Sequence, residues 1–319
     1  MNNLITTPIT DKEAWLAQRV LDVTSTEVSA LYGLSPYMSE FELFHQKRDK
    51  EVVRIEENER MTWGKRLEDA IALGAAETMG WEVEKMDVYI RDPQARMGSS
   101  FDYKILKASG RPGVGIMEIK NVDGIQYHRH WLDDGQGNIE APEHIEMQIQ
   151  HQMEVANIDW CCLVALVGGN TQKIIYRERN RQIGEDIRDR VTKFWSQVDS
   201  NSAPSPDYTK DAEFIIKKLR GTAIEGLVAT ADGGLDDLIS RYAYVAKESG
   251  DLAKLKEQMK AEILDRVGEA SKVLSSFGTI SCSMTAPSLG KEVTQDMVGT
   301  FVGGRSGFRN FRFTAKKGA

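Results

Sequence analysis

Apolar residues recur along the first 200 positions with two periods, one typical of helices and one typical of strands. Helical spacing predicts helices over 24–34, 63–80, 142–158 and 182–198. Strand-like runs are expected around 83–90, 97–106, 114–121, 161–167 and 173–176, with a Gly/Pro-rich turn at 107–113. Since helices and strands alternate, the pattern predicts an α/β core.

The predicted helix at 24–34 begins with a capping pattern, Thr24 followed three residues later by Glu27. Val28, Leu31 and Leu34 then follow at helical spacing. Free N–H groups and the helix dipole favour an anion at such a start. The hydroxyl groups of this segment therefore either only cap the helix or also help to bind a phosphate.

A Ser/Pro-rich stretch, "DSNSAPSPD" at 199–207, predicts a domain boundary. Beyond it, apolar residues from Leu235 to Leu274 follow a roughly heptad spacing. Gly250 weakens the pattern, so one long helix and a hairpin of two helices both fit. The tail from Phe301 onward is basic and aromatic without an acidic residue, which suits nucleic acid and equally a solvated terminus.

Composition and charge indicate where the protein is located and how it would contact DNA. The 319 residues carry a net charge of −7, no apolar run long enough to span a membrane, and no basic-then-apolar leader pattern. The three cysteines form no C-x-x-C pair and indicate reduced thiols in a cytoplasmic protein. An acidic chain of this kind is expected to contact DNA only through a locally basic surface.

Charged residues enter the strand-like runs in "MGSSFDYKILKASGRPGVGIMEIK", residues 97–120. Alternate residues of a strand share a face, so Ser100 and Asp102 share one, as do Glu118 and Lys120. If the two runs pair as a hairpin, these side chains converge. Two carboxylates and a backbone carbonyl such as that of Ile119 form a hard-oxygen site suited to Mg²⁺. A cross-strand ion pair is the structural alternative.

Four motifs occur in an order that resembles a known family: "TWGKRLEDA" (62–70), "GSSFD" (98–102), "MEIK" (117–120) and "EMQIQHQM" (146–153). They resemble the YqaJ-type viral recombinase and phage lambda exonuclease family, over roughly residues 10–200. The resemblance implies a PD-(D/E)XK, restriction-endonuclease-like core over 1–203, with a central mixed sheet flanked by helices. Residues 204–319 would form a mainly helical extension ending in the basic-aromatic tail.

The resemblance also implies roles for individual residues. The implied catalytic set is Glu68, Asp102, Glu118, Lys120 and Gln148. The implied metal ligands are Asp102, Glu118 and the Ile119 carbonyl, with Glu68 nearby, and the implied contacts to the terminal 5′-phosphate are Arg19, Thr26, Ser100 and Gln148. Met61 stands where lambda exonuclease has an apolar wedge residue. The chain departs from the family pattern at Phe101, Tyr103 and Thr26, which leaves the pocket shape open.

The function implied is a Mg²⁺-dependent 5′-to-3′ exonuclease on linear double-stranded DNA, using two ions, with Mn²⁺ as a substitute. It would leave 3′ single strands for annealing recombination in a bacterial cytoplasm, encoded by a phage or prophage. The family further implies a homo-oligomer such as a trimeric ring and a single-strand annealing protein as partner. A structure-specific or site-specific endonuclease of the same fold, and a non-catalytic DNA-end-binding protein, are the alternatives.

Overall fold

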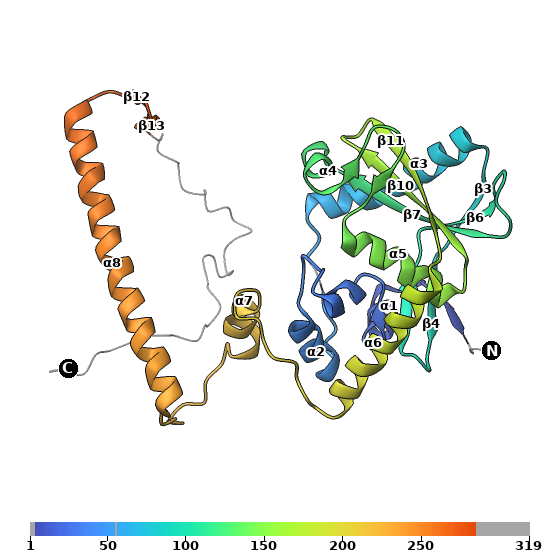
Figure 1. Ribbon diagram of the computed structural model, residues 1–319, viewed down its shortest axis with the longest axis horizontal. Helices are drawn as coiled ribbons and strands as arrows, with labels where there is room; N and C mark the ends of the chain where they lie inside the picture. The colour runs from blue at the N-terminus through green and yellow to red at the C-terminus, as the bar shows by residue number, and fades with distance from the viewer. Residues whose placement is uncertain (1–3, 55, 285–319) are drawn as a thin grey trace, which may run out of the picture. The chain divides into compact units, whose positions relative to one another are not determined.

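The computed structural model describes residues 4–54 and 56–284, and the chain divides into two compact units, Met1–Phe214 and Ile215–Ala319 (Figure 1). The helices of the first unit are α1 (Lys12–Arg19), the 3₁₀ helix η1 (Val28–Tyr32), α2 (Glu40–Arg48), α3 (Glu59–Met79), α4 (Gly124–His130), α5 (Glu143–Ala156), α6 (Arg181–Asp199) and α7 (Ala212–Phe214). Its strands are β1 (Ile5–Pro8), β2 (Val23–Thr24), β3 (Glu82–Lys85), β4 (Val88–Asp92), β5 (Met97–Ser100), β6 (Tyr103–Lys107), β7 (Gly115–Val122), β8 (Leu132–Asp133), β9 (Ile139–Glu140), β10 (Trp160–Val167) and β11 (Thr171–Glu178).

Two larger sheets organise the first unit. The five-stranded sheet has the order β11-β10-β7-β6-β3, in which β7 and β10 are parallel and the other neighbours are antiparallel. The four-stranded sheet has the order β1-β4-β5-β2. The predicted α/β class with a central mixed sheet flanked by helices is confirmed.

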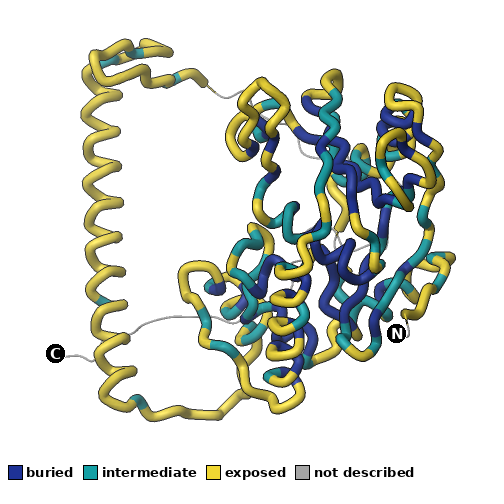
Figure 2. Tube along the Cα trace, turned by 45° about the vertical axis from the view of Figure 1, so that its right-hand side comes forward, coloured by how far each residue is buried: buried dark blue, intermediate teal, exposed yellow. Residues whose placement is uncertain are grey.

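Helices pack on both faces of the five-stranded sheet, which explains why its strands are so apolar. Figure 2 shows the buried segments gathered in the interior of this unit. On one face, Ile149 and Met153 of α5 pack with Ile116 and Leu163. On the other face, α3 packs with the alternate residues of the same strands, among them Ile119. The period of two therefore places the side chains of 118 and 120 on the α5 side.

The run predicted as one strand over 97–106 is in fact two strands in different sheets. β5 belongs to the four-stranded sheet and β6 to the five-stranded sheet, so the chain leaves one sheet and enters the other at Phe101 and Asp102. The run at 83–90 is likewise divided between β3 and β4. Alternation of apolar residues indicates that one face of a strand is buried. It does not indicate which strand lies beside it, or in which sheet.

The helix predicted over 24–34 is also wrong in type. Thr24 ends β2, and only a 3₁₀ helix, η1, follows a turn. Glu27 accepts a hydrogen bond from the Thr24 N–H at 2.9 Å, so half of the capping pattern is present without the α-helix. The helix dipole invoked for an anion at this place is therefore not available, because η1 is too short to provide one.

Gly98 allows β5 to approach a buried ring. A Cβ at this position would lie 2.2 Å from the Tyr89 hydroxyl and 2.7 Å from Asp22 Oδ2. Tyr89 is almost fully buried and donates a hydrogen bond to Asp22, so neither group can move away easily. We expect Gly98→Ala to destabilise the fold by about 1–3 kcal/mol, measured by urea unfolding. The control is Gly74→Ala on α3, where the added carbon meets nothing within 4 Å.

The second unit contains η2 (Ile215–Leu219), α8 (Gly233–Val267), β12 (Lys272–Ser275) and β13 (Gly278–Ser281). α8 is one continuous helix, which resolves the choice between a long helix and a hairpin. Gly250 lies inside it, and none of its side chains is buried. The basic-aromatic tail from Phe301 falls outside the described residues.

Candidate active site and 5′-phosphate pocket

Asp102 lies where β6 and β7 part. The two strands pair only as far as Tyr103 and Met117. Beyond Met117, the edge of β7 opposite β10 therefore has no paired strand among the described residues. The N–H of Ile119 there donates to Asp102 Oδ2 at 2.8 Å. Because the N–H and C=O of one strand residue point to the same side, the Ile119 carbonyl faces the same gap as Asp102.

Glu118 is buried, with only 3% of its surface exposed, and both carboxylate oxygens are engaged. Its Oε1 accepts from Lys120 Nζ at 2.5 Å and from Gln148 Nε2 at 2.6 Å. Its Oε2 accepts from Gln152 Nε2 at 2.7 Å. Gln148 and Gln152 are four residues apart on α5, which places both amides on one helix face above the strand.

Like charges gather at this gap. Burial, then the negative charges of Glu118 and Glu68, raises the pKa of Asp102 well above its ordinary value. Burial also raises the pKa of Glu68 of α3, whose carboxylate lies 3.8 Å from Nζ of Lys85, the last residue of β3. Glu68 is thus near enough to act on Asp102 by its charge, but its ion-pair partner is Lys85.

The donor set fits a hard divalent cation. Asp102, Glu118 and the Ile119 carbonyl offer oxygen atoms at one opening, and mutually repelling carboxylates are stabilised by a cation. The buried Oε1 of Gln152 has no hydrogen-bond partner within the described ranges and adds one more oxygen beside Glu118. Across residues 4–54 and 56–284 no three His, Cys, Asp or Glu side chains form a metal-binding cluster, so a cation here would depend on the carboxylate pair and on backbone or amide oxygens.

A second polar group surrounds Arg19. The Arg19 guanidinium donates to Thr26 Oγ1 at 3.1 Å and to Thr24 Oγ1 at 3.3 Å. It also stacks over the Trp15 ring, 4.9 Å from the centroid, and Trp15 Nε1 donates to Ser100 Oγ at 2.8 Å. The structure therefore brings three of the four predicted phosphate contacts, Arg19, Thr26 and Ser100, into one neighbourhood through the Trp15 indole.

A buried ion pair between Lys47 and Glu27 packs against the backbone of Arg19. Lys47 Nζ lies 2.8 Å from Glu27 Oε2 and donates to the Arg19 carbonyl at 2.8 Å, with only 4% of its side chain exposed. Burial opposes ionisation of Glu27, but the charges of Lys47 and Arg19 prevail and lower its pKa. Arg19 itself forms no ion pair in the part of the chain that the structure describes. Its charge is available to an anion.

Comparison with known proteins identifies the domain that carries both groups. Residues 14–159, which include every residue of the candidate site, match the YqaJ-like viral recombinase domain. This segment is a YqaJ-like viral recombinase domain. The predicted family is confirmed by this match.

The proteins that this chain resembles are distant from it in sequence. The uncharacterized protein YqaJ of Bacillus subtilis is 24% identical over 268 residues, covering 80% of this chain and 79% of its own. An alkaline exonuclease from Laribacter hongkongensis is 19% identical with a TM-score of 0.47, covering 60% of this chain and 94% of its own. A phage-related exonuclease from Haemophilus somnus is 14% identical with a TM-score of 0.44, covering 57% and 97%.

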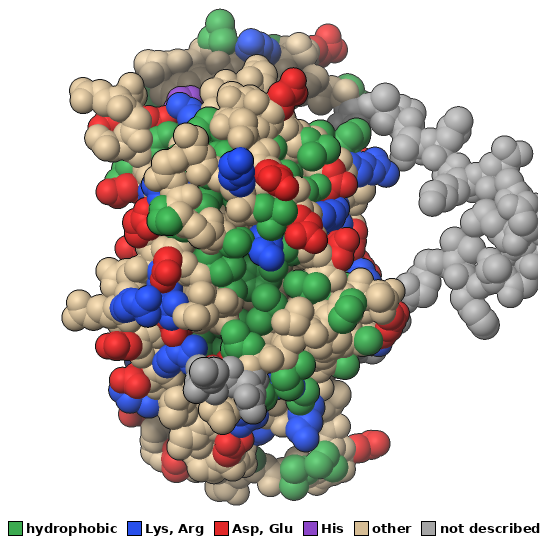
Figure 3. All heavy atoms as spheres, turned by 90° about the vertical axis from the view of Figure 1, so that its right-hand side faces the viewer, with side chains coloured by type: hydrophobic (Ala, Val, Ile, Leu, Met, Phe, Trp, Pro, Cys, Tyr) green, Lys and Arg blue, Asp and Glu red, His purple; other side chains and the backbone are tan. Residues whose placement is uncertain are grey.

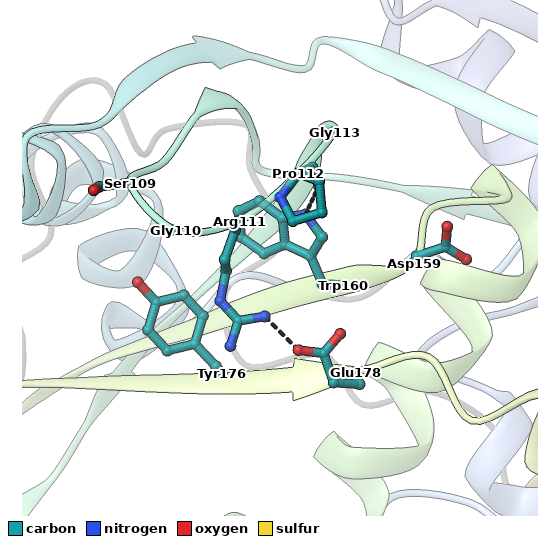
Figure 4. Close-up of a pocket in the computed structure, with 9 residues that line it drawn as sticks. All are labelled: Ser109, Gly110, Arg111, Pro112, Gly113, Asp159, Trp160, Tyr176 and Glu178. Carbon is teal, nitrogen blue, oxygen red and sulfur yellow. Dashed lines mark hydrogen bonds and ion pairs between the residues drawn. The ribbon is translucent and has the colours of Figure 1, made fainter.

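A hollow of about 680 Å³ lies at the β6–β7 turn of the YqaJ-like domain, away from the carboxylate pair (Figure 4). Arg111 occupies it, stacked 4.1 Å from the Tyr176 centroid and ion-paired with Glu178. A guanidinium already neutralised and stacked is a structural feature of the turn. On the face drawn in Figure 3, basic and acidic side chains are interspersed around an apolar centre, so this face is not the basic surface expected for DNA. No described helix is long and apolar enough to cross a membrane.

His151 lies one turn from Gln148 but turns into the core of the YqaJ-like domain, where Nε2 contacts the Val23 carbonyl at 3.2 Å. Burial lowers its pKa from 6.5 to about 4. The unfolded chain therefore binds a proton between these values that the folded chain does not, so stability falls as pH drops through 6.5. At 1.36 kcal/mol per pKa unit, we expect this histidine alone to reduce the unfolding free energy by about 2 kcal/mol between pH 6.5 and 5.

The measurement is urea unfolding of the wild type and His151→Met at pH 7, 6 and 5. The variant should lose that part of the pH dependence, because methionine of similar volume does not titrate. Equal pH dependence in both proteins would contradict the assignment of this proton uptake to His151.

Three residues that contribute to the site, Trp15, Lys47 and Gln152, were not predicted from the sequence. Gln152 has a signal in the sequence, since it follows Gln148 by four residues on a predicted helix. Trp15 and Lys47 have none, because the residues they join, Ser100 and Glu27, lie 85 and 20 positions away along the chain.

Proposed function

We propose that the protein is a Mg²⁺-dependent deoxyribonuclease that degrades linear double-stranded DNA from the 5′ end and leaves a 3′ single strand. The observation that carries the proposal is the carboxylate pair Asp102 and Glu118 with Lys120, beside a pocket whose guanidinium is free for an anion. The family match supports an enzyme of nuclease type that acts on DNA. The 5′-to-3′ direction and the linear duplex substrate are proposed from the family resemblance alone.

In the proposed mechanism Asp102, Glu118 and the Ile119 carbonyl would hold Mg²⁺, and Glu68 would add negative charge nearby. Bound there, Mg²⁺ would lower the pKa of a water molecule and offset charge on the scissile phosphate. Burial lowers the pKa of Lys120, but the charges of Glu118 and Asp102 outweigh it and raise the value. Lys120 would orient the attacking water or take its proton, and its positive charge would stabilise the negative charge that develops on the phosphate.

Arg19, Thr26 and Ser100 would hold the terminal 5′-phosphate. The threonine hydroxyls accept from Arg19 and lie 3.3 Å apart, so one donates to the other and the remaining proton is left for a phosphate oxygen. A guanidinium supplies two parallel donors to phosphate, which is both strong and directional. Gln148, bound to Glu118, would link this pocket to the carboxylate pair and favour a DNA end over an internal position.

The test is digestion of linear duplex DNA labelled at one 5′ or 3′ end, with Mg²⁺, Mn²⁺ or EDTA, beside closed circular DNA. We expect Mg²⁺-dependent loss of 5′ label, retention of circles, and activity with Mn²⁺. Cutting of circles or branched DNA would favour the endonuclease. Binding of ends without cleavage under every metal condition would favour the non-catalytic end-binding protein.

A homo-oligomer, such as a trimeric ring, and a phage single-strand annealing protein complete the proposal by family analogy. A ring would keep the enzyme on the DNA between cleavage steps. The partner would coat the 3′ single strand that digestion leaves. The 204–319 region is the proposed extension, separate from the 1–203 nuclease domain. Light scattering of the purified full chain gives the oligomer number directly.

A further inference from the structure

Tyr37 presents an aromatic ring to solvent at the rim of the candidate site. It lies between η1 and α2, and 79% of its surface is exposed. The Tyr37 ring contacts the ring of His144, at 5.9 Å between centroids and an interplanar angle of 90°. The perpendicular imidazole fixes the orientation of the ring, and the high exposure leaves ring surface open to solvent.

His144 relates this ring to the carboxylate pair. His144 and Gln148 are four residues apart on α5 and so share a face, one turn of about 5.4 Å apart. Gln148 contacts Glu118, so Tyr37 packs against the residue one helical turn before the one that contacts the carboxylate. Burial and then the charge of Lys120 lower the pKa of His144, which agrees with this closeness.

The same chain segment carries the phosphate pocket. Thr24 and Thr26 precede η1 and Tyr37 follows it, so one short stretch connects the pocket to the exposed ring. A strand whose terminal phosphate is held at Arg19, and whose first phosphodiester reaches Glu118, must place its first base near the rim. An open aromatic face is the surface on which any of the four bases can stack.

We propose that Tyr37 stacks on the base of the 5′-terminal nucleotide and so positions the strand for cleavage. This inference rests on the proposed exonuclease function. Stacking does not distinguish among bases, which suits an enzyme that must digest every sequence. The ring contributes through its face, and its hydroxyl is not needed.

The experiment compares single-turnover digestion by the wild type, Tyr37→Ala and Tyr37→Phe on duplexes with an intact or an abasic 5′-terminal nucleotide. We expect Tyr37→Ala to reduce the apparent affinity for the intact end by about 10- to 100-fold, as loss of one base stack does, and Tyr37→Phe to stay within about twofold. On the abasic end, wild type and Tyr37→Ala should digest equally, because the contact is already missing. Tyr208→Ala, which removes another ring exposed to 73%, is the matched control.

Two results would overturn the inference while leaving the nuclease intact. One is wild-type affinity of Tyr37→Ala for intact ends, and the other is an equal loss on intact and abasic ends. Failure of the wild type to digest any linear duplex would instead overturn the proposed function, and this inference with it. A preference for 5′-phosphate that survives in Tyr37→Ala shows that the pocket is unharmed.

Discussion

Lys120→Met is expected to slow Mg²⁺-dependent digestion by about 10²–10³-fold, the usual cost of losing one preorganised donor to a developing charge. Methionine keeps the volume and the packing against α5 but removes the cation that contacts Glu118 at 2.5 Å. Single-turnover rates at saturating enzyme measure the effect, because they report the chemical step rather than DNA binding.

The matched control for this prediction is Lys173→Met. Lys173 lies in the same sheet, pairs with Asp133 at 2.9 Å, and has 29% of its side chain exposed, against 27% for Lys120. The control should digest at the wild-type rate. Equal slowing of both variants would assign the effect to a general loss of a paired lysine. A wild-type rate for Lys120→Met would remove this residue from the mechanism.

Arg19→Ala is expected to abolish the preference for 5′-phosphorylated over 5′-hydroxyl ends, a loss of about 10- to 100-fold for hydrogen bonds to a charged group. The reason is that both threonine hydroxyls contact the Arg19 guanidinium, while the nearby Glu27 carboxylate is paired with Lys47. Arg19→Lys should recover only part of the preference, since an ammonium lacks the paired donors of the fork.

The readout for Arg19 is the ratio of digestion rates on the two kinds of end, which a general loss of stability does not change. Arg48→Ala is the control, because Arg48 is a surface arginine already paired with Asp49 at 2.7 Å. A ratio unchanged in Arg19→Ala would mean that the 5′-phosphate is held elsewhere. A ratio lowered equally by Arg48→Ala would point to non-specific attraction of DNA.

The sequence by itself determined those features that depend on local spacing. The period of two placed Glu118 and Lys120 on one face of β7, and the helical period predicted α5 and α6 nearly to their ends. The order of motifs also gave the family, since the residues that carry chemistry stand at set distances along the chain. These features need no knowledge of which elements meet.

Tertiary structure decided the rest, because it depends on partners distant in sequence. The exit from one sheet into another at Asp102 frees the Ile119 N–H and carbonyl, and nothing in the alternating pattern marks that point. Trp15 joins Arg19 to Ser100, and Lys47 fixes Glu27, across separations that periodicity cannot express. Local spacing determines the direction of a side chain relative to its own element, whereas the neighbours of that element determine what the side chain contacts.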